Sequence, residues 1–67
     1  MNLYSYSGPV TQFGKCIKNR WESTTYAVSE KKARSNFIYQ FKQEFNYRVN
    51  TKIDIPGKIT LVEEMAS

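Results

Sequence analysis

The sequence predicts an α+β fold in which a three-stranded antiparallel sheet is packed by one helix, with a C-terminal strand or hairpin (β-β-β-α-β). Residues 3–28 are rich in strand-favouring side chains broken by turn signals. Apolar side chains then recur every fourth residue, at Ala33, Phe37, Phe41 and Phe45, which is the stripe of an amphipathic helix. Beyond them, isoleucines alternate with polar residues on both sides of Pro56-Gly57, as in a terminal strand or tight hairpin.

The first part of the chain is predicted to form three strands, over residues 3–6, 10–18 and 24–28. The turn signal Ser7-Gly8-Pro9 separates the first two, and a polar turn around Trp21 separates the last two. Gly14 interrupts the alternation of the second strand and predicts a bulge or a close backbone approach.

The helix is predicted to begin at Ser29, whose hydroxyl can accept a hydrogen bond from an otherwise unpaired backbone N–H group. Its apolar stripe, with Ile38 beside it, is expected to face the sheet. One helix covers one face of a small sheet, so the other face is expected to be open.

Length and charge limit the functional classes. At 67 residues the chain is one domain, 1–67. A chain of this size buries only about 60% of its unfolded surface, so we expect a monomer or a homodimer. The net charge of +4 favours polyanionic partners. Cys16, the only cysteine, favours a reducing cytoplasm, and no apolar run is long enough to span a membrane.

The residues that usually perform catalysis or bind metals are scarce. There is no histidine, and one cysteine cannot make a zinc site. The stretch "GPVTQFGKC" differs from the phosphate-binding P-loop, because five residues separate its glycines and Cys16 replaces the hydroxyl residue. We therefore expect no enzymatic activity, no metal and no cofactor.

Basic residues gather in the middle of the sequence. Lysines and arginines in the first turns of a helix are repelled by the positive end of its dipole, which costs about 0.3–1 kcal/mol each. A phosphate bound there is attracted both by the dipole and by the cations, so it turns an unfavourable arrangement into a favourable one. The predicted fold brings the second strand near the helix start, so all six cations are expected to form one patch. The alternative is that they are solvated charges that keep a small protein soluble. The predicted nucleic-acid-binding residues are Lys15, Lys18, Arg20, Lys31, Lys32 and Arg34.

Aromatic residues lie among these cations and could stack on bases from an open sheet face or form the core. Phe13 is expected in the core. For Trp21, exposure in a contact role and packing are expected equally. The possible contact aromatics are Trp21 and Tyr26, with Tyr4 and Tyr6 as further candidates.

One short stretch and the order of the predicted elements resemble known nucleic-acid-binding domains. "SEKKAR" resembles the start of the last helix of double-stranded RNA-binding domains, which implies phosphate contacts by Lys31, Lys32 and Arg34. The chain lacks that family's N-terminal helix and Gly-Pro-x-His loop, so DNA is favoured over RNA. The element order is similar to that of the arm-binding domains of tyrosine recombinases, which implies DNA contacts by Lys15, Lys18 and Arg20.

Over most of its length, the pattern "YSYSGPV…FGKCI…W" with "SEKKARSN" and "IPGKI" is similar to small uncharacterised proteins encoded on bacterial prophages and conjugative elements. The likeness implies a mobile-element accessory protein. Together these observations predict a small basic cytoplasmic protein that binds nucleic acid, with duplex DNA favoured, through phosphates. The alternative is a protein–protein interaction module or host-factor modulator that uses a sheet edge or an aromatic face and is possibly a homodimer.

Overall fold

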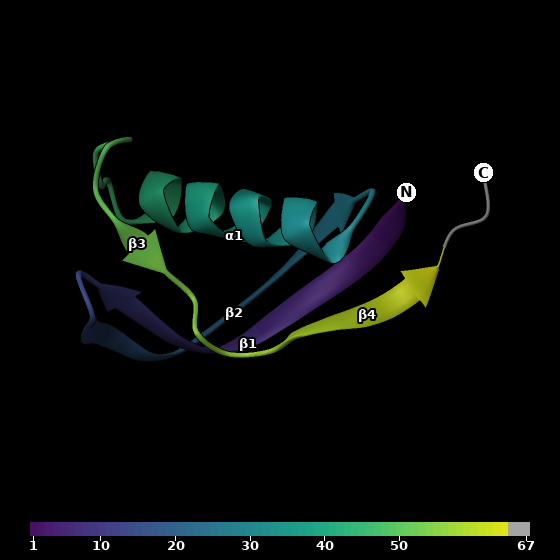
Figure 1. The fold of residues 1–67 in the computed structure, drawn as a ribbon, viewed down its shortest axis with the longest axis horizontal. Coiled ribbons are helices and arrows are strands. Elements are labelled where there is room, and N and C mark those ends of the chain that lie inside the picture. The colour runs from purple at the N-terminus through teal and green to yellow at the C-terminus, as the bar shows by residue number, and fades with distance from the viewer. Residues whose placement is uncertain (65–67) are drawn as a thin grey trace.

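A computed structural model describes residues 1–64 as an antiparallel sheet with one helix packed on one face (Figure 1). Its elements, in chain order, are β1 (Asn2–Gln12), β2 (Lys15–Ala27), α1 (Glu30–Glu44), β3 (Ile53–Asp54) and β4 (Ile59–Glu64). β1 is central, with β2 on one side and both β3 and β4 on the other. The predicted α+β class is confirmed, and within residues 1–64 a single helix lies between N-terminal and C-terminal strands.

The residues before the helix form two long strands, whereas three short ones were predicted. The turn lies at Phe13-Gly14, where both φ angles are positive, 52° and 81°. Positive φ at both central residues is the signature of the type I′ turn, whose twist suits a hairpin. Gly14 is therefore a turn residue, and the predicted bulge at this position is wrong.

The two turns predicted from sequence lie inside strands. The ladder between β1 and β2 shifts register between Gly8 and Val10 and again between Val10 and Thr11. Such shifts absorb irregular residues such as Pro9, which has no N–H group to donate to the ladder. Pro9 and residues 19–20 lie at the first of these shifts, whereas residues 21–23 pair regularly with β1, so the sequence signals mark an irregularity inside the strands and not a turn.

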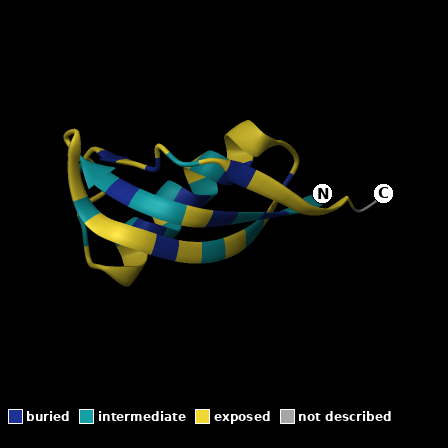
Figure 2. Cartoon of the chain, turned by 90° about the horizontal axis from the view of Figure 1, so that it is seen from below, coloured by how far each residue is buried: buried dark blue, intermediate teal, exposed yellow. Residues whose placement is uncertain are grey.

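The core lies between α1 and the sheet, and its helix stripe was predicted correctly at Ala33, Phe37 and Phe41. Phe45 is the exception, because it caps the helix and is exposed. Buried and exposed residues alternate along much of the strands (Figure 2), as expected when one sheet face is covered. The sheet contributes Tyr4, Tyr6, Val10, Trp21, Ala27, Ile53 and Ile59, and Ile55 joins them from the segment between β3 and β4.

Hydrogen bonds close both ends of α1. Ser29 is the N-cap, as predicted, and its Oγ accepts from the backbone N–H of Lys32 at 3.2 Å. At the other end Asn46 has a φ of 59°, and the Tyr47 N–H donates to the Lys42 carbonyl at 2.8 Å. That bond, from the second residue beyond the cap, is typical of a Schellman motif.

The C-terminal segment follows β1 and does not form a hairpin of its own. Ile53, Ile55 and Ile59 are all buried, so the segment runs along the core with Pro56-Gly57 between its two short strands. The Tyr6 hydroxyl anchors it: this group donates to the Pro9 carbonyl at 2.6 Å and accepts from the Gly57 N–H at 3.0 Å. A Cβ at position 57 would lie 2.7 Å from that oxygen, so a larger residue here would force the buried Tyr6 side chain to shift.

Candidate nucleic-acid interface

The six predicted cations do not form one patch, because Lys31 and Lys32 lie at one end of the molecule and Lys15 and Lys18 lie at the other. Lys31 and Lys32 stand at the start of α1, beside the end of β2. Lys18 lies near the other end of the helix, with its Nζ 5.2 Å from the centre of the Phe45 ring. The 15 residues of α1 separate these ends by about 22 Å. The predicted joint patch is wrong because β2 runs toward the helix start, which places its first residues a full strand away.

Two of the six cations bind other groups of the chain. The half-buried Arg34 donates from its guanidinium to the Ile55 carbonyl, which fastens α1 to the C-terminal segment. Arg20 donates to Ser7 Oγ at 3.2 Å and forms an ion pair with Glu22 at 2.9 Å. That pair is largely exposed and adds little stability, but it screens the charge of Arg20.

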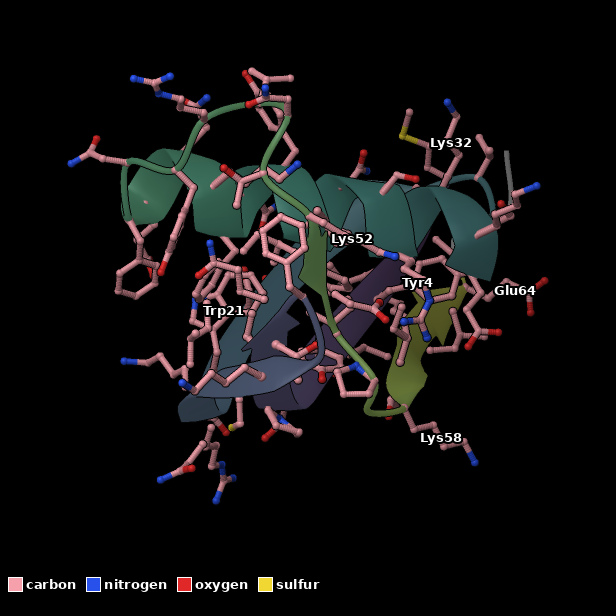
Figure 3. The ribbon with its side chains drawn as sticks, turned by 60° about the vertical axis from the view of Figure 1, so that its left-hand side comes forward. Tyr4, Trp21, Lys32, Lys52, Lys58 and Glu64 are labelled. Carbon is pink, nitrogen blue, oxygen red and sulfur yellow. The ribbon has the colours of Figure 1, made fainter. Side chains whose placement is uncertain are left out.

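At the helix start, acidic residues accompany the cations. Lys31 and Lys32 are exposed, and Glu30 lies in the same turn. Glu63 and Glu64 end β4 at this end of the sheet, where they pair with Leu3 and Asn2 of β1. Figure 3 shows Lys32 and Glu64 on the same side of the molecule. With these neighbours, the helix start is not a strongly positive surface.

Cations outnumber acids at the hairpin end of the molecule. Gln12 pairs with Lys15 on one side and with Ile53 on the other, and the Phe13 N–H donates to the Lys52 carbonyl at 3.3 Å. Arg48 stands in the nearby connection from α1 to β3, where its carbonyl accepts from Thr51. Four exposed cations belong to these segments, and we call this set the basic end: Lys15, Lys18, Arg48 and Lys52.

The acidic side chains closest to the basic end accept hydrogen bonds. Glu44 accepts from the indole Nε1 of Trp21 at 3.0 Å, and Asp54 accepts from the Ile55 N–H at 2.9 Å. Within residues 1–64, none of the four cations of the basic end is in an ion pair. Their charges are therefore available to a ligand.

Sequence reasoning missed Arg48 and Lys52 because more than thirty residues separate them from Lys15 in the chain. Lys52 comes near Lys15 only because β1 pairs with β2 on one side and with β3 on the other. No pattern within a short stretch of the sequence predicts that strand pairing.

The aromatic residues are distributed differently from the prediction. Trp21 is only 6% exposed and packs edge-on against Phe41, with ring centres 5.3 Å apart, so the packing alternative holds. Tyr4 and Tyr6 are buried as well, whereas Tyr26 is exposed. Phe13 was expected in the core and is 72% exposed at the hairpin turn. Its position in the turn, not its hydrophobicity, decides where the ring points.

The open sheet face is polar and offers no aromatic platform of the predicted kind. Ser7, Arg20 and Glu22 form a small hydrogen-bonded group there, with Ser7 Oγ donating to Glu22 at 3.2 Å. The buried tyrosines point toward the helix, which leaves Tyr26 as the exposed aromatic ring of β2.

Over residues 1–64 no three acidic or cysteine side chains lie close enough together to hold a metal ion. No helix in the same range is long and apolar enough to cross a bilayer. Comparisons of the chain with protein-family models, with curated proteins and with solved structures found no match.

Proposed function

We propose that the protein binds nucleic acid, with duplex DNA as its partner, and that the basic end provides the main phosphate contacts. The observation that carries the proposal is a set of four exposed cations from two segments: Lys15 and Lys18 of β2, and Arg48 and Lys52 of the connection between α1 and β3. A second observation supports it: within residues 1–64, none of these four cations forms an ion pair with an acidic side chain.

Phosphate contacts make a quantitative prediction about salt. Each phosphate neutralised on B-DNA lowers log K by about 0.9 for each unit of log salt concentration. Four contacts at the basic end therefore give a slope of about −3.6, or roughly a hundredfold weaker binding when salt rises from about 50 to 200 mM.

Lys31 and Lys32 are a second proposed contact, weaker than the basic end. The Ser29 hydroxyl already binds the backbone N–H of Lys32, and Glu30 stands beside both lysines. Arg20 and Arg34 rank below them, because Glu22 and the Ile55 carbonyl hold their guanidinium groups.

Two double variants with equal loss of charge test this ranking. The first is Lys15→Ala with Lys52→Ala, and the matched control is Lys31→Ala with Lys32→Ala. Affinity for a 15-base-pair DNA duplex and a matching RNA duplex is measured by fluorescence anisotropy at several salt concentrations. We expect the first variant to bind DNA about tenfold or more weakly and with a shallower salt slope, and the control to bind nearly as the parent does.

Amide NMR spectra recorded during the same titration locate the contact. Salt-sensitive shifts at residues 12–18 and 48–53 are the expected result. Shifts centred on residues 29–34, with greater loss in the control variant, would move the contact to the helix start. Absence of binding to either duplex at low salt would refute nucleic-acid binding.

The biological setting of the proposal rests on the sequence alone. The likeness to small proteins of bacterial prophages and conjugative elements supports an accessory role on a mobile element, and the single cysteine supports a cytoplasmic location. Recovery of the tagged protein with DNA of such an element, after crosslinking in a host, is the corresponding test.

The free edge of β2 favours a second candidate function, protein–protein interaction with a second copy of the chain. β2 is 13 residues long and, within residues 1–64, pairs only with β1. An unpaired edge can accept another strand. Sedimentation equilibrium over a wide range of protein concentration decides this point, since edge pairing predicts a dimer and the first proposal requires only a monomer.

A further inference from the structure

Phe13 combines an unfavourable backbone conformation with a largely exposed ring. Its φ is 52°, in the left-handed region that bulky side chains rarely adopt, and type I′ turns favour asparagine before glycine. Its ring is 72% exposed. Within the described residues, the close aromatic pairs and the cation–π contact all involve other rings. Backbone strain combined with exposure at one residue is the pattern found at functional sites.

The backbone that carries this ring is held on both sides. Gln12 pairs with Lys15 of β2 and with Ile53 of β3, and the Phe13 N–H donates to the Lys52 carbonyl at 3.3 Å. The turn is thus fixed between Lys15, the first residue of β2, and Lys52, the residue just before β3. The backbone of Phe13 is therefore held beside that of Lys15 and Lys52, and its exposed ring is free to meet a ligand there.

Resting on the proposed function, we propose that Phe13 stacks on an unpaired base of DNA whose phosphates are held by the basic end. Surfaces that bind single strands combine cations for the backbone with exposed aromatic rings for the base faces. In a paired duplex the faces of the bases are covered by their neighbours, and the grooves present only their edges. The preferred ligand is therefore DNA in which a duplex continues into unpaired bases, such as an overhang or a gap.

Three DNA ligands separate stacking from charge. The first is a fully paired 15-base-pair duplex, and the second is the same duplex with a four-nucleotide single-stranded overhang. The third carries an abasic overhang with the same number of phosphates. The parent protein is expected to bind the base-containing overhang at least about fivefold more tightly than the abasic one, because base–aromatic stacking has a magnitude of this order or larger.

The variant Phe13→Asn removes the ring but places the favoured residue in the type I′ turn, so the hairpin is retained. We expect this variant to bind the paired duplex as the parent does and to lose its preference for the base-containing overhang. Phe13→Tyr is expected to keep the preference. A 2-aminopurine placed in the overhang reports stacking directly, through fluorescence quenching by the parent and by Phe13→Tyr but not by Phe13→Asn.

The outcomes distinguish the two proposals. Salt-sensitive binding to all three ligands with no preference between base and abasic overhangs overturns the stacking proposal and leaves nucleic-acid binding standing. An equal preference in Phe13→Asn also overturns it, since the ring would then play no part. Failure to bind any of the three ligands at low salt overturns both.

Discussion

Replacing Tyr6 by phenylalanine tests what holds the C-terminal segment to the sheet. Tyr6 is 1% exposed, and its hydroxyl bridges Pro9 and Gly57, which lie on different elements of the fold. The Tyr6→Phe variant keeps the ring and its packing against Trp21 and Phe37 but removes the bridging oxygen.

The expected loss of stability follows from the two hydrogen bonds. Each contributes about 0.5–1.5 kcal/mol net, so the free energy of unfolding should fall by about 1–3 kcal/mol. A chain of 67 residues has a total of only about 3–10 kcal/mol. For a domain this small, each 1 kcal/mol corresponds to a shift in Tm of about 4–8 °C.

Urea unfolding followed by the fluorescence of Trp21, the only tryptophan, measures this change. The midpoint should fall while the slope m stays constant, because the same surface is exposed on unfolding. Tyr39→Phe is the matched control: Tyr39 is 59% exposed, so the same change there should shift the stability by less than about 0.5 kcal/mol. Equal midpoints for Tyr6→Phe and Tyr39→Phe would refute the bridging role of the Tyr6 hydroxyl.

Further predictions concern the same segment, the core and pH. Gly57→Ala should destabilise by about 1–3 kcal/mol by overpacking, and the loss should be smaller in the Tyr6→Phe background, since part of the clash is with the Tyr6 hydroxyl; a double-mutant cycle in urea checks this. Arg34→Ala should cost about 1–3 kcal/mol by leaving the Ile55 carbonyl unpaired, with DNA affinity nearly unchanged; a large loss of affinity in a folded variant would contradict this assignment. Phe37→Ala, at a fully buried site, should cost about 3–5 kcal/mol and leave much of the protein unfolded by circular dichroism. Burial raises the pKa of Tyr6 above its usual value of 10, so above that pH the folded state keeps a proton that the unfolded state loses. The contribution of Tyr6 to stability should therefore be constant below about pH 10 and fall above it. Urea midpoints of Tyr6→Phe should lack this decline.

The helix and the fold class could be predicted from sequence because their signals are local. Ala33, Phe37 and Phe41 recur with the period of a helix, and Ser29 has the side chain that an N-cap requires. Their positions depend only on neighbours within one or two turns. The same is true of the alternation that marked the chain before and after the helix as strand.

The candidate site could not be predicted in the same way. Lys15, Lys18 and Arg20 were identified from sequence, but their separation from Lys31 and Lys32 depends on the length and direction of β2. Gly14, which lies between two strand-like stretches, was a signal for the true turn. The turn was not recognised because Phe13, the residue before it, is one that type I′ turns disfavour.

Composition, helical periodicity and the N-cap residue were enough to predict a small, basic α+β domain with one amphipathic helix, because these signals need no knowledge of contacts between distant segments. Which cations lie close together and which aromatic ring faces solvent depends on the tertiary structure. β1 pairs with β2 and with β3, and that long-range pairing brings Lys15 and Lys52 to either side of Phe13. Register between strands that are far apart in the chain depends on the packing of the whole core, so it cannot be obtained from any one segment.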